Sequence, residues 1–139
     1  MTAVAATAAG LGLIAVAEDL RCRRVPNWLT AAGVAGGLAC AAWAGWHGLG
    51  MAAAGAVAGF LILLPFHCCG AMGGGDVKLM AAYGALLGPS GILLAAVFAA
   101  VFGGLGAAAA LIWKPRTAAI PYAPAIVLGA WLSLLGGGS

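Results

Sequence analysis

The stretch Gly73-Gly74-Gly75-Asp76-Val77-Lys78-Leu79 places a carboxylate and an ammonium group inside a chain that is otherwise almost continuously apolar. The chain has 139 residues, of which 65% are hydrophobic and 6% charged, whereas about a quarter of the residues in a soluble domain are charged. Such a small number of charged residues cannot cover a surface that faces water. The composition therefore predicts an integral membrane protein. A charge at membrane depth is costly and usually marks a functional site.

The apolar runs on both sides of this stretch predict an all-α bundle of six transmembrane helices, forming one domain over residues 1–139. The expected spans are 2–17, 28–46, 50–66, 76–87, 91–113 and 121–135. The first run leads directly into charged residues and then into more membrane segment, so we expect a retained helix and not a cleaved signal peptide. The fourth run has only about 12 residues, whereas a crossing needs about 20. We therefore expect its start to lie below the membrane surface.

The basic residues are distributed on one side only. Six spans place the loops around 19–27, 67–78 and 114–120 on the same face of the membrane, and these loops contain Arg21, Arg23, Arg24, Lys78, Lys114 and Arg116. Basic loops face the cytoplasm. The sequence therefore predicts a multi-pass protein of the inner or plasma membrane with both termini outside. This asymmetry also explains the net charge of +3, so we expect no nucleic-acid partner.

The same topology places Asp19 and Asp76 together at the cytoplasmic face. Two neighbouring carboxylates share one proton because like charges repel, and such a pair can both activate a water molecule and protonate a peptide carbonyl. The residues alone leave other interpretations open. Asp76 could be a helix N-cap, Asp19 a solvated loop residue, and His67 either a group that tunes the site or an ordinary interfacial residue. A small non-enzymatic carrier or pilus-assembly subunit could also use the carboxylates to move protons or cations.

Other hydrolytic chemistries lack their residues in this sequence. It contains no H-E-x-x-H motif of a zinc protease, and its four cysteines show no C-x-x-C spacing from which a disulfide framework could be read; we expect no cofactor. Three glycine pairs at four-residue spacing predict close helix contacts within a compact bundle. They are Gly33 and Gly37, Gly55 and Gly59, and Gly84 and Gly88.

Two of these stretches together resemble the type IV prepilin peptidase family of GxGD aspartyl proteases. Residues 73–79 match its G-x-G-D-x-K-L signature, and Asp19-Leu20-Arg21-Cys22-Arg23-Arg24-Val25-Pro26-Asn27 is similar to its first-aspartate segment. Ile120-Pro121-Tyr122-Ala123-Pro124 is similar to a proline-containing element before the last helix of the family. Absence of paired zinc-binding cysteines makes the chain look like the short form found in Flp or tight-adherence pilus systems.

The resemblance implies an aspartic endopeptidase that cuts the leader from a pilin precursor at the cytoplasmic membrane face without a metal. The precursor would carry a basic leader followed by a hydrophobic helix. Asp19 and Asp76 would be the catalytic pair. The supporting or substrate-binding residues would be Gly73, Gly75, Lys78, Pro26 and Asn27.

Overall fold

The computed structural model of the chain describes residues 2–22, 25–70, 73–113 and 123–136, and the regular secondary structure in these ranges is helical. The all-α prediction is therefore confirmed for this part of the chain. Five helices follow one another: α1 (Thr2–Cys22), α2 (Asn27–Ala42), α3 (Gly45–Cys68), α4 (Gly74–Trp113) and α5 (Ala123–Gly136).

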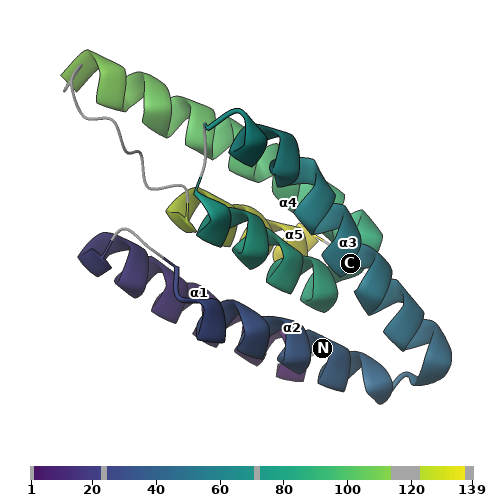
Figure 1. The fold of residues 1–139 in the computed structure, drawn as a ribbon. Coiled ribbons are helices and arrows are strands. Elements are labelled where there is room, and N and C mark those ends of the chain that lie inside the picture. Colours follow the sequence, from purple (N-terminus) through teal and green to yellow (C-terminus); the bar gives the residue numbers. More distant parts are fainter. Residues whose placement is uncertain (1, 23–24, 71–72, 114–122, 137–139) are drawn as a thin grey trace.

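Helix α4 is divided at Gly88, whose backbone has φ 74° and ψ 178°. This conformation is essentially restricted to glycine, and the following Pro89 lacks the N–H that would continue the helical hydrogen bonds. The helical segments 74–87 and 89–113 run in opposite directions on either side of this residue (Figure 1). The prediction of six separate helices is wrong in this respect, because one glycine turns the backbone without a loop between the fourth and fifth segments.

The segment 74–87 occupies the centre of the bundle. Helix α4 packs against each of the other four helices, and nearly every residue between Val77 and Leu86 is buried or half-buried. The largest fully buried side chains are Tyr83, Leu79, Met80, Ile92, Ile126 and Val77. Four of these six belong to the segment 74–87, which therefore provides much of the core.

Close contact between α3 and α4 depends on glycine. A methyl group at Gly55 of α3 or at Gly84 of α4 would overlap the backbone of the other helix, and one at Gly59 would overlap the carbonyl of Met80. Gly33 and Gly37 of α2 contact Ala82 and Ala85 of α4 in the same way. The predicted glycine pairs therefore lie at helix contacts, with Gly88 against Gly55.

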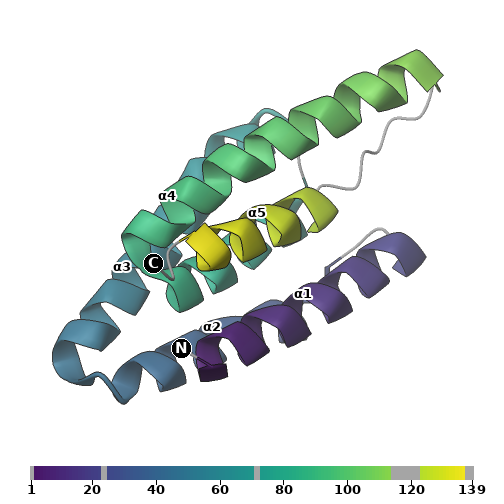
Figure 2. The ribbon, with the colours of Figure 1, turned by 180° about the vertical axis from the view of Figure 1, so that it is seen from behind.

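The helices alternate in direction, so their ends gather at two opposite ends of the bundle (Figures 1 and 2). The last turns of α1 and α3 and the first turns of α2 and α4 lie at one end. The start of α1, the end of α5, the connection between α2 and α3, and the kink at Gly88 lie at the other. Both predicted motifs are therefore at the same end of the bundle.

Three helices are long and apolar enough to cross a membrane by length and composition: Ala3–Cys22, Gly45–Cys68 and Gly74–Gly106, the last of which contains the turn at Gly88. Pro124–Gly136 is a shorter apolar helix. Large apolar side chains cover the outside of the bundle, and Trp43 and Trp46 are 95% and 89% exposed. Trp28 lies at the opposite end of α2, about 22 Å from Trp43 along the helix at 1.5 Å per residue. Exposed tryptophans therefore lie near both ends of α2, as in the aromatic belts of membrane proteins.

Candidate active site

Asp19 is held by the packed face of α1. The buried residues of this helix recur at three- and four-residue spacing through Ala8, Leu11 and Ala15 to Asp19, which is the spacing of one helical face. Asp19 lies in the last turn of α1 and is only 6% exposed. The interpretation of Asp19 as a solvated loop residue is therefore wrong.

Asp76 is the third residue of α4, in its first turn, and is half-buried. Its backbone N–H donates to the carbonyl of Gly73 at 3.2 Å. The helix begins at Gly74 and not at Asp76 or Val77 as predicted, so Asp76 stands inside the first turn and is not the N-cap. The partial positive charge of a helix N-terminus therefore lies beside this carboxylate.

Both aspartates line a single cavity of about 630 Å³, and their carboxylates interact electrostatically. The walls come from the last turn of α1, the connection to α2, and the start of α4. The lining residues are Glu18, Asp19, Cys22, Val25, Pro26, Asn27, Gly73, Gly74, Gly75 and Asp76. The cavity thus contains all three acidic residues of the sequence. Four of the five predicted supporting residues also line it; Lys78 lies just outside.

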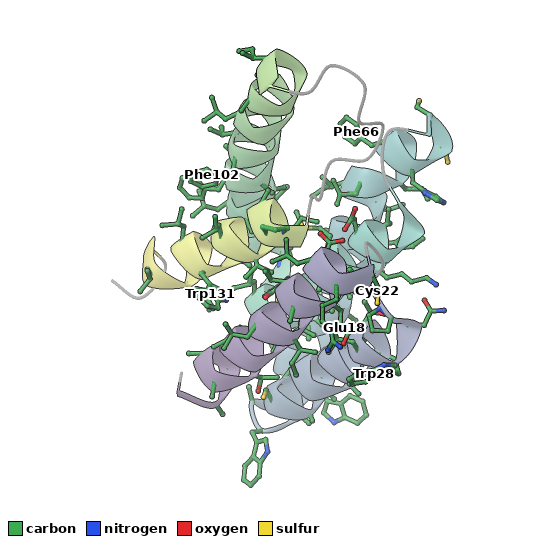
Figure 3. All side chains as sticks on the ribbon, turned by 90° about the vertical axis from the view of Figure 1, so that its left-hand side faces the viewer. Glu18, Cys22, Trp28, Phe66, Phe102 and Trp131 are labelled. Atoms are coloured by element: carbon green, nitrogen blue, oxygen red, sulfur yellow. The ribbon has the colours of Figure 1, made fainter. Side chains whose placement is uncertain are left out.

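Glu18 and Cys22 line the cavity although the sequence analysis gave them no role there. Figure 3 shows both side chains on α1 beside the start of α2, which carries Trp28. They are four residues apart, so they share a helical face next to the face of Asp19. This four-residue spacing could have indicated that Glu18 and Cys22 lie together beside the site. It does so only once the position of α2 is known.

Lys78 joins the two sequence motifs directly. Its Nζ donates to Oδ1 of Asn27 at 2.9 Å, although 51 residues separate them in the chain. The start of α2 is held from within as well, because the hydroxyl of buried Thr30 donates to the carbonyl of Asn27 at 2.9 Å. Asn27, at the edge of the cavity, is therefore bonded both to Lys78 of α4 and to Thr30 of its own helix.

Gly75 allows α4 to approach the connection between α1 and α2. A methyl group at Gly75 would lie 3.1 to 3.3 Å from Cβ and backbone atoms of Val25, which is tighter than ordinary contact. A methyl group at Gly73 would meet only Oδ2 of Asp76, at 4.0 Å. The structure therefore distinguishes the two motif glycines: a methyl group at Gly75 would require Val25 to shift by a few tenths of an ångström, whereas one at Gly73 has room.

His67 lies near the site without lining the cavity. It is exposed near the end of α3, and a methyl group at Gly74 would lie 3.4 Å from its ring.

Among the basic residues, Arg21 is exposed at the same end of the bundle. The other predicted features at this face lie outside the described residues: Arg23, Arg24, Lys114, Arg116 and the stretch Ile120-Pro121-Tyr122.

Within the described ranges, no three His, Cys, Asp or Glu side chains are grouped so that they could hold a metal ion. The cavity offers a pair of aspartate carboxylates that can take part in acid–base chemistry. They lie at the end of the helical bundle, where the backbone of α4 comes close to Val25 at Gly75. The two aspartates come from segments more than fifty residues apart, and helix packing brings both to the lining of one cavity.

Residues 6–108 match the sequence profile of the type IV leader peptidase family. The chain belongs to this family. The matched range contains both Asp19 and Asp76 and extends through most of the second segment of α4. The family resemblance predicted from the two motifs is therefore confirmed, and the leader peptidase profile covers the whole described cavity.

Curated proteins similar to this leader peptidase family member carry the name prepilin leader peptidase/N-methyltransferase. The Bacillus subtilis (strain 168) protein is 42% identical over 89 residues, which cover 61% of this chain and 36% of the relative. The Aeromonas salmonicida (strain A449) and Aeromonas hydrophila proteins are 35% and 30% identical over 133 and 130 residues, each covering 87% of this chain and 45% of the relative. The chain thus spans less than half the length of these relatives. No solved structure matches it.

Proposed function

We propose that the protein is a membrane-embedded aspartic endopeptidase that removes the leader peptide from type IV, Flp-like pilin precursors. The observation that carries this proposal is the meeting of Asp19 and Asp76 in one cavity, in a chain that belongs to the type IV leader peptidase family. Gly73, Gly75, Pro26, Asn27 and Lys78 support the pair by shaping or holding the cavity.

The mechanism uses a pair that shares one proton. The ionised aspartate takes a proton from water as the water oxygen attacks the carbonyl carbon of the scissile bond, and the protonated aspartate donates to the carbonyl oxygen. The tetrahedral intermediate then collapses and the C–N bond breaks: the aspartate that took the water proton gives it to the leaving amine, while a hydroxyl of the intermediate returns its proton to the other aspartate, so the pair again holds one proton. Activity should fall at both low and high pH, because only the singly protonated pair performs both steps.

The cavity belongs at the cytoplasmic face of the cell membrane. The chain would cross six times, through α1, α2, α3, the two segments of α4 and α5, with both termini outside. The alternating helix directions support this arrangement (Figure 1), as does the presence of Arg21 and Lys78 at the end of the bundle that holds the cavity. Segment 74–87 begins inside the bundle, where irregular backbone is tolerated if protein shields it.

The alternative function, a carrier that moves protons or cations, receives less support. A relay across the membrane needs ionisable groups spread through its depth. Here Asp19 is in the last turn of α1 and Asp76 in the first turn of α4, so all the acids lie at one end of the bundle. A carboxylate pair that is open to one side of the membrane suits hydrolysis of a peptide segment that enters from that side.

The test is co-expression with a candidate pilin precursor, followed by mass spectrometry of the pilin N-terminus. Asp19→Asn and Asp76→Asn should each lower the rate of cleavage by about 100- to 10,000-fold, the range lost with an acid–base group. Both variants should remain in the membrane at the level of the unmodified protein. Normal processing by either variant would exclude the mechanism.

A further inference from the structure

The bond between Lys78 and Asn27 fixes which way the side-chain amide of Asn27 faces. An ammonium group can only donate hydrogen bonds, so the atom that meets Lys78 Nζ at 2.9 Å must be the amide oxygen of Asn27. The amide nitrogen, Nδ2, then keeps two N–H groups that this contact does not use. The orientation follows from chemistry and not from a choice between two similar atoms.

Asn27 is held on a rigid part of the chain. Pro26 is the N-cap residue of α2, so Asn27 stands inside the helix and does not fill the capping role common for asparagine. The hydroxyl of Thr30 holds its backbone carbonyl, and the N–H groups of Leu29 and Thr30 donate to the carbonyl of Pro26. The backbone of Asn27 is therefore held by the first turn of α2, and its exposed side chain is oriented by the hydrogen bond from the exposed Lys78, an arrangement that favours positioning of a ligand.

The cavity is rich in hydrogen-bond acceptors. The charged side chains that line it within the described residues are all acids, and Asn27 is the one lining side chain there that carries N–H groups. A peptide that enters gives up water around its own carbonyl oxygens, and each of these needs a donor or loses stability. Ionised carboxylates cannot donate, so the side-chain donor that the described lining offers such a peptide, besides the protonated aspartate, is the amide of Asn27; backbone N–H groups in the first turn of α4 can donate as well.

We propose that Asn27 is a substrate-positioning residue whose Nδ2 donates to a backbone carbonyl of the bound peptide beside the scissile bond. Lys78 acts through Asn27: it lies outside the cavity lining and keeps the amide turned with its nitrogen available. This inference rests on the proposed peptidase function and assigns specific roles within the same site. It explains why a lysine two residues after Asp76 is bonded to a residue at the start of α2.

The test measures kcat and KM for cleavage of a pilin-precursor peptide by the purified full chain in lipid nanodiscs. Asn27→Asp keeps an acceptor for Lys78 but removes the N–H groups, and Asn27→Ala removes both. Both variants should raise KM about five- to tenfold, as expected for one lost hydrogen bond, with a smaller change in kcat. Equal losses in the two variants would show that the missing donor matters and not the added charge. Asn27→Gln, which keeps the N–H groups, should recover part of the loss.

The role of Lys78 is tested in the same assay. Lys78→Met should raise KM in the unmodified chain but have no further effect in the Asn27→Ala background, because its action passes through Asn27. Lys114→Met, the same change at the other lysine of the sequence, controls for the loss of a positive charge. The pH dependence of kcat should be unchanged in Asn27→Ala and Asn27→Gln, since the aspartate pair is intact and these variants add no charge to the cavity.

Two outcomes would overturn the inference. One is an unchanged KM in Asn27→Asp, and the other is a Lys78→Met effect of equal size with and without Asn27. Failure of the proposed function has a different signature, namely that the unmodified chain leaves the peptide uncut.

Discussion

The hydroxyl of Tyr83 donates to the carbonyl of Ala8 at 3.1 Å in the buried core, and this bond joins the two helices that carry the aspartates. Tyr83 is seven residues after Asp76, about two helical turns, and Ala8 is eleven residues before Asp19, about three turns at 3.6 residues per turn. Each bonded residue therefore shares a helical face with one aspartate. The bond therefore ties α1 to α4 on the faces that carry the two carboxylates.

Replacing Tyr83 with Phe should weaken this link while keeping the ring in the core. We expect the free energy of unfolding to fall by about 0.5–1.5 kcal/mol, the usual value of one buried hydrogen bond, with a lower melting temperature in detergent. Thr7→Val is a matched control, because the Thr7 hydroxyl also donates to a carbonyl, that of Ala3, but within α1. A melting temperature for Tyr83→Phe no lower than that of the control would contradict the proposed importance of the link.

The two motif glycines should respond differently to the same added methyl group. Gly75→Ala presses against Val25, so the start of α4 must move away from the connection between α1 and α2. A displacement of this kind beside the carboxylates should lower kcat/KM on the order of tenfold or more, because small misplacements of reacting groups are costly. Gly73→Ala has room for its methyl group and should retain most of the activity. Equal losses in the two variants, in the cleavage assay, would show that packing against Val25 is not the cause.

Much of the site was predictable from the sequence because charges are so rare in it. Asp19 and Asp76 stand out against an apolar chain, and their place at helix ends follows from the lengths of the apolar runs. The burial of Asp19 was not predictable, since it depends on which face of α1 packs inward. The same holds for Lys78 and Asn27: a hydrogen bond across 51 residues is decided by the relative placement of α2 and α4.

The helix boundaries show a second limit. Glycine is a poor helix former, so the run from Gly73 to Gly75 suggested a loop, yet α4 begins at Gly74 because tertiary packing supports its first turn. The sequence Gly88-Pro89 was correctly read as a break, but the chain turns there within one residue. The sign of φ at Gly88 is a property of the packed structure and is not visible in the composition.

A side chain at Gly88 should therefore be destabilising. Its positive φ with extended ψ costs a residue with a Cβ about 1–3 kcal/mol, so Gly88→Ala should lower stability by this amount. Gly91→Ala would not be a clean comparison because its methyl group meets the side chain of Leu87. Gly50→Ala is better, since Gly50 has no neighbour within reach of a methyl group and no positive φ. Equal melting temperatures for Gly88→Ala and Gly50→Ala would contradict the strained backbone.

The close contact between α3 and α4 predicts the effect of adding a methyl group at Gly84. Gly84→Ala would place a methyl group on the backbone of Gly55, so the helices must separate, at a cost of about 1–3 kcal/mol or more. Gly104→Ala is the control within the same helix, because nothing lies within 4 Å of a methyl group there. Alanine should stabilise that position by about 0.5–1 kcal/mol through its higher helix propensity. Denaturation in detergent compares the two, and a Gly84→Ala protein as stable as the Gly104→Ala protein would exclude close backbone contact.

Cys22 offers a direct way to obstruct the cavity. Its thiol is exposed and lines the space that holds both aspartates, so a bulky maleimide attached there should block entry of a peptide. In chains that retain a single cysteine, labelling Cys22 should lower cleavage at least about tenfold, whereas Cys22→Ser alone should leave it nearly unchanged because the thiol takes no part in the chemistry. Labelling a chain with only Cys68, which is exposed at the end of α3 but not in the cavity lining, is the control. Full activity after complete labelling of Cys22 would show that the substrate does not enter through this cavity, and the peptidase would then need another route to Asp19 and Asp76.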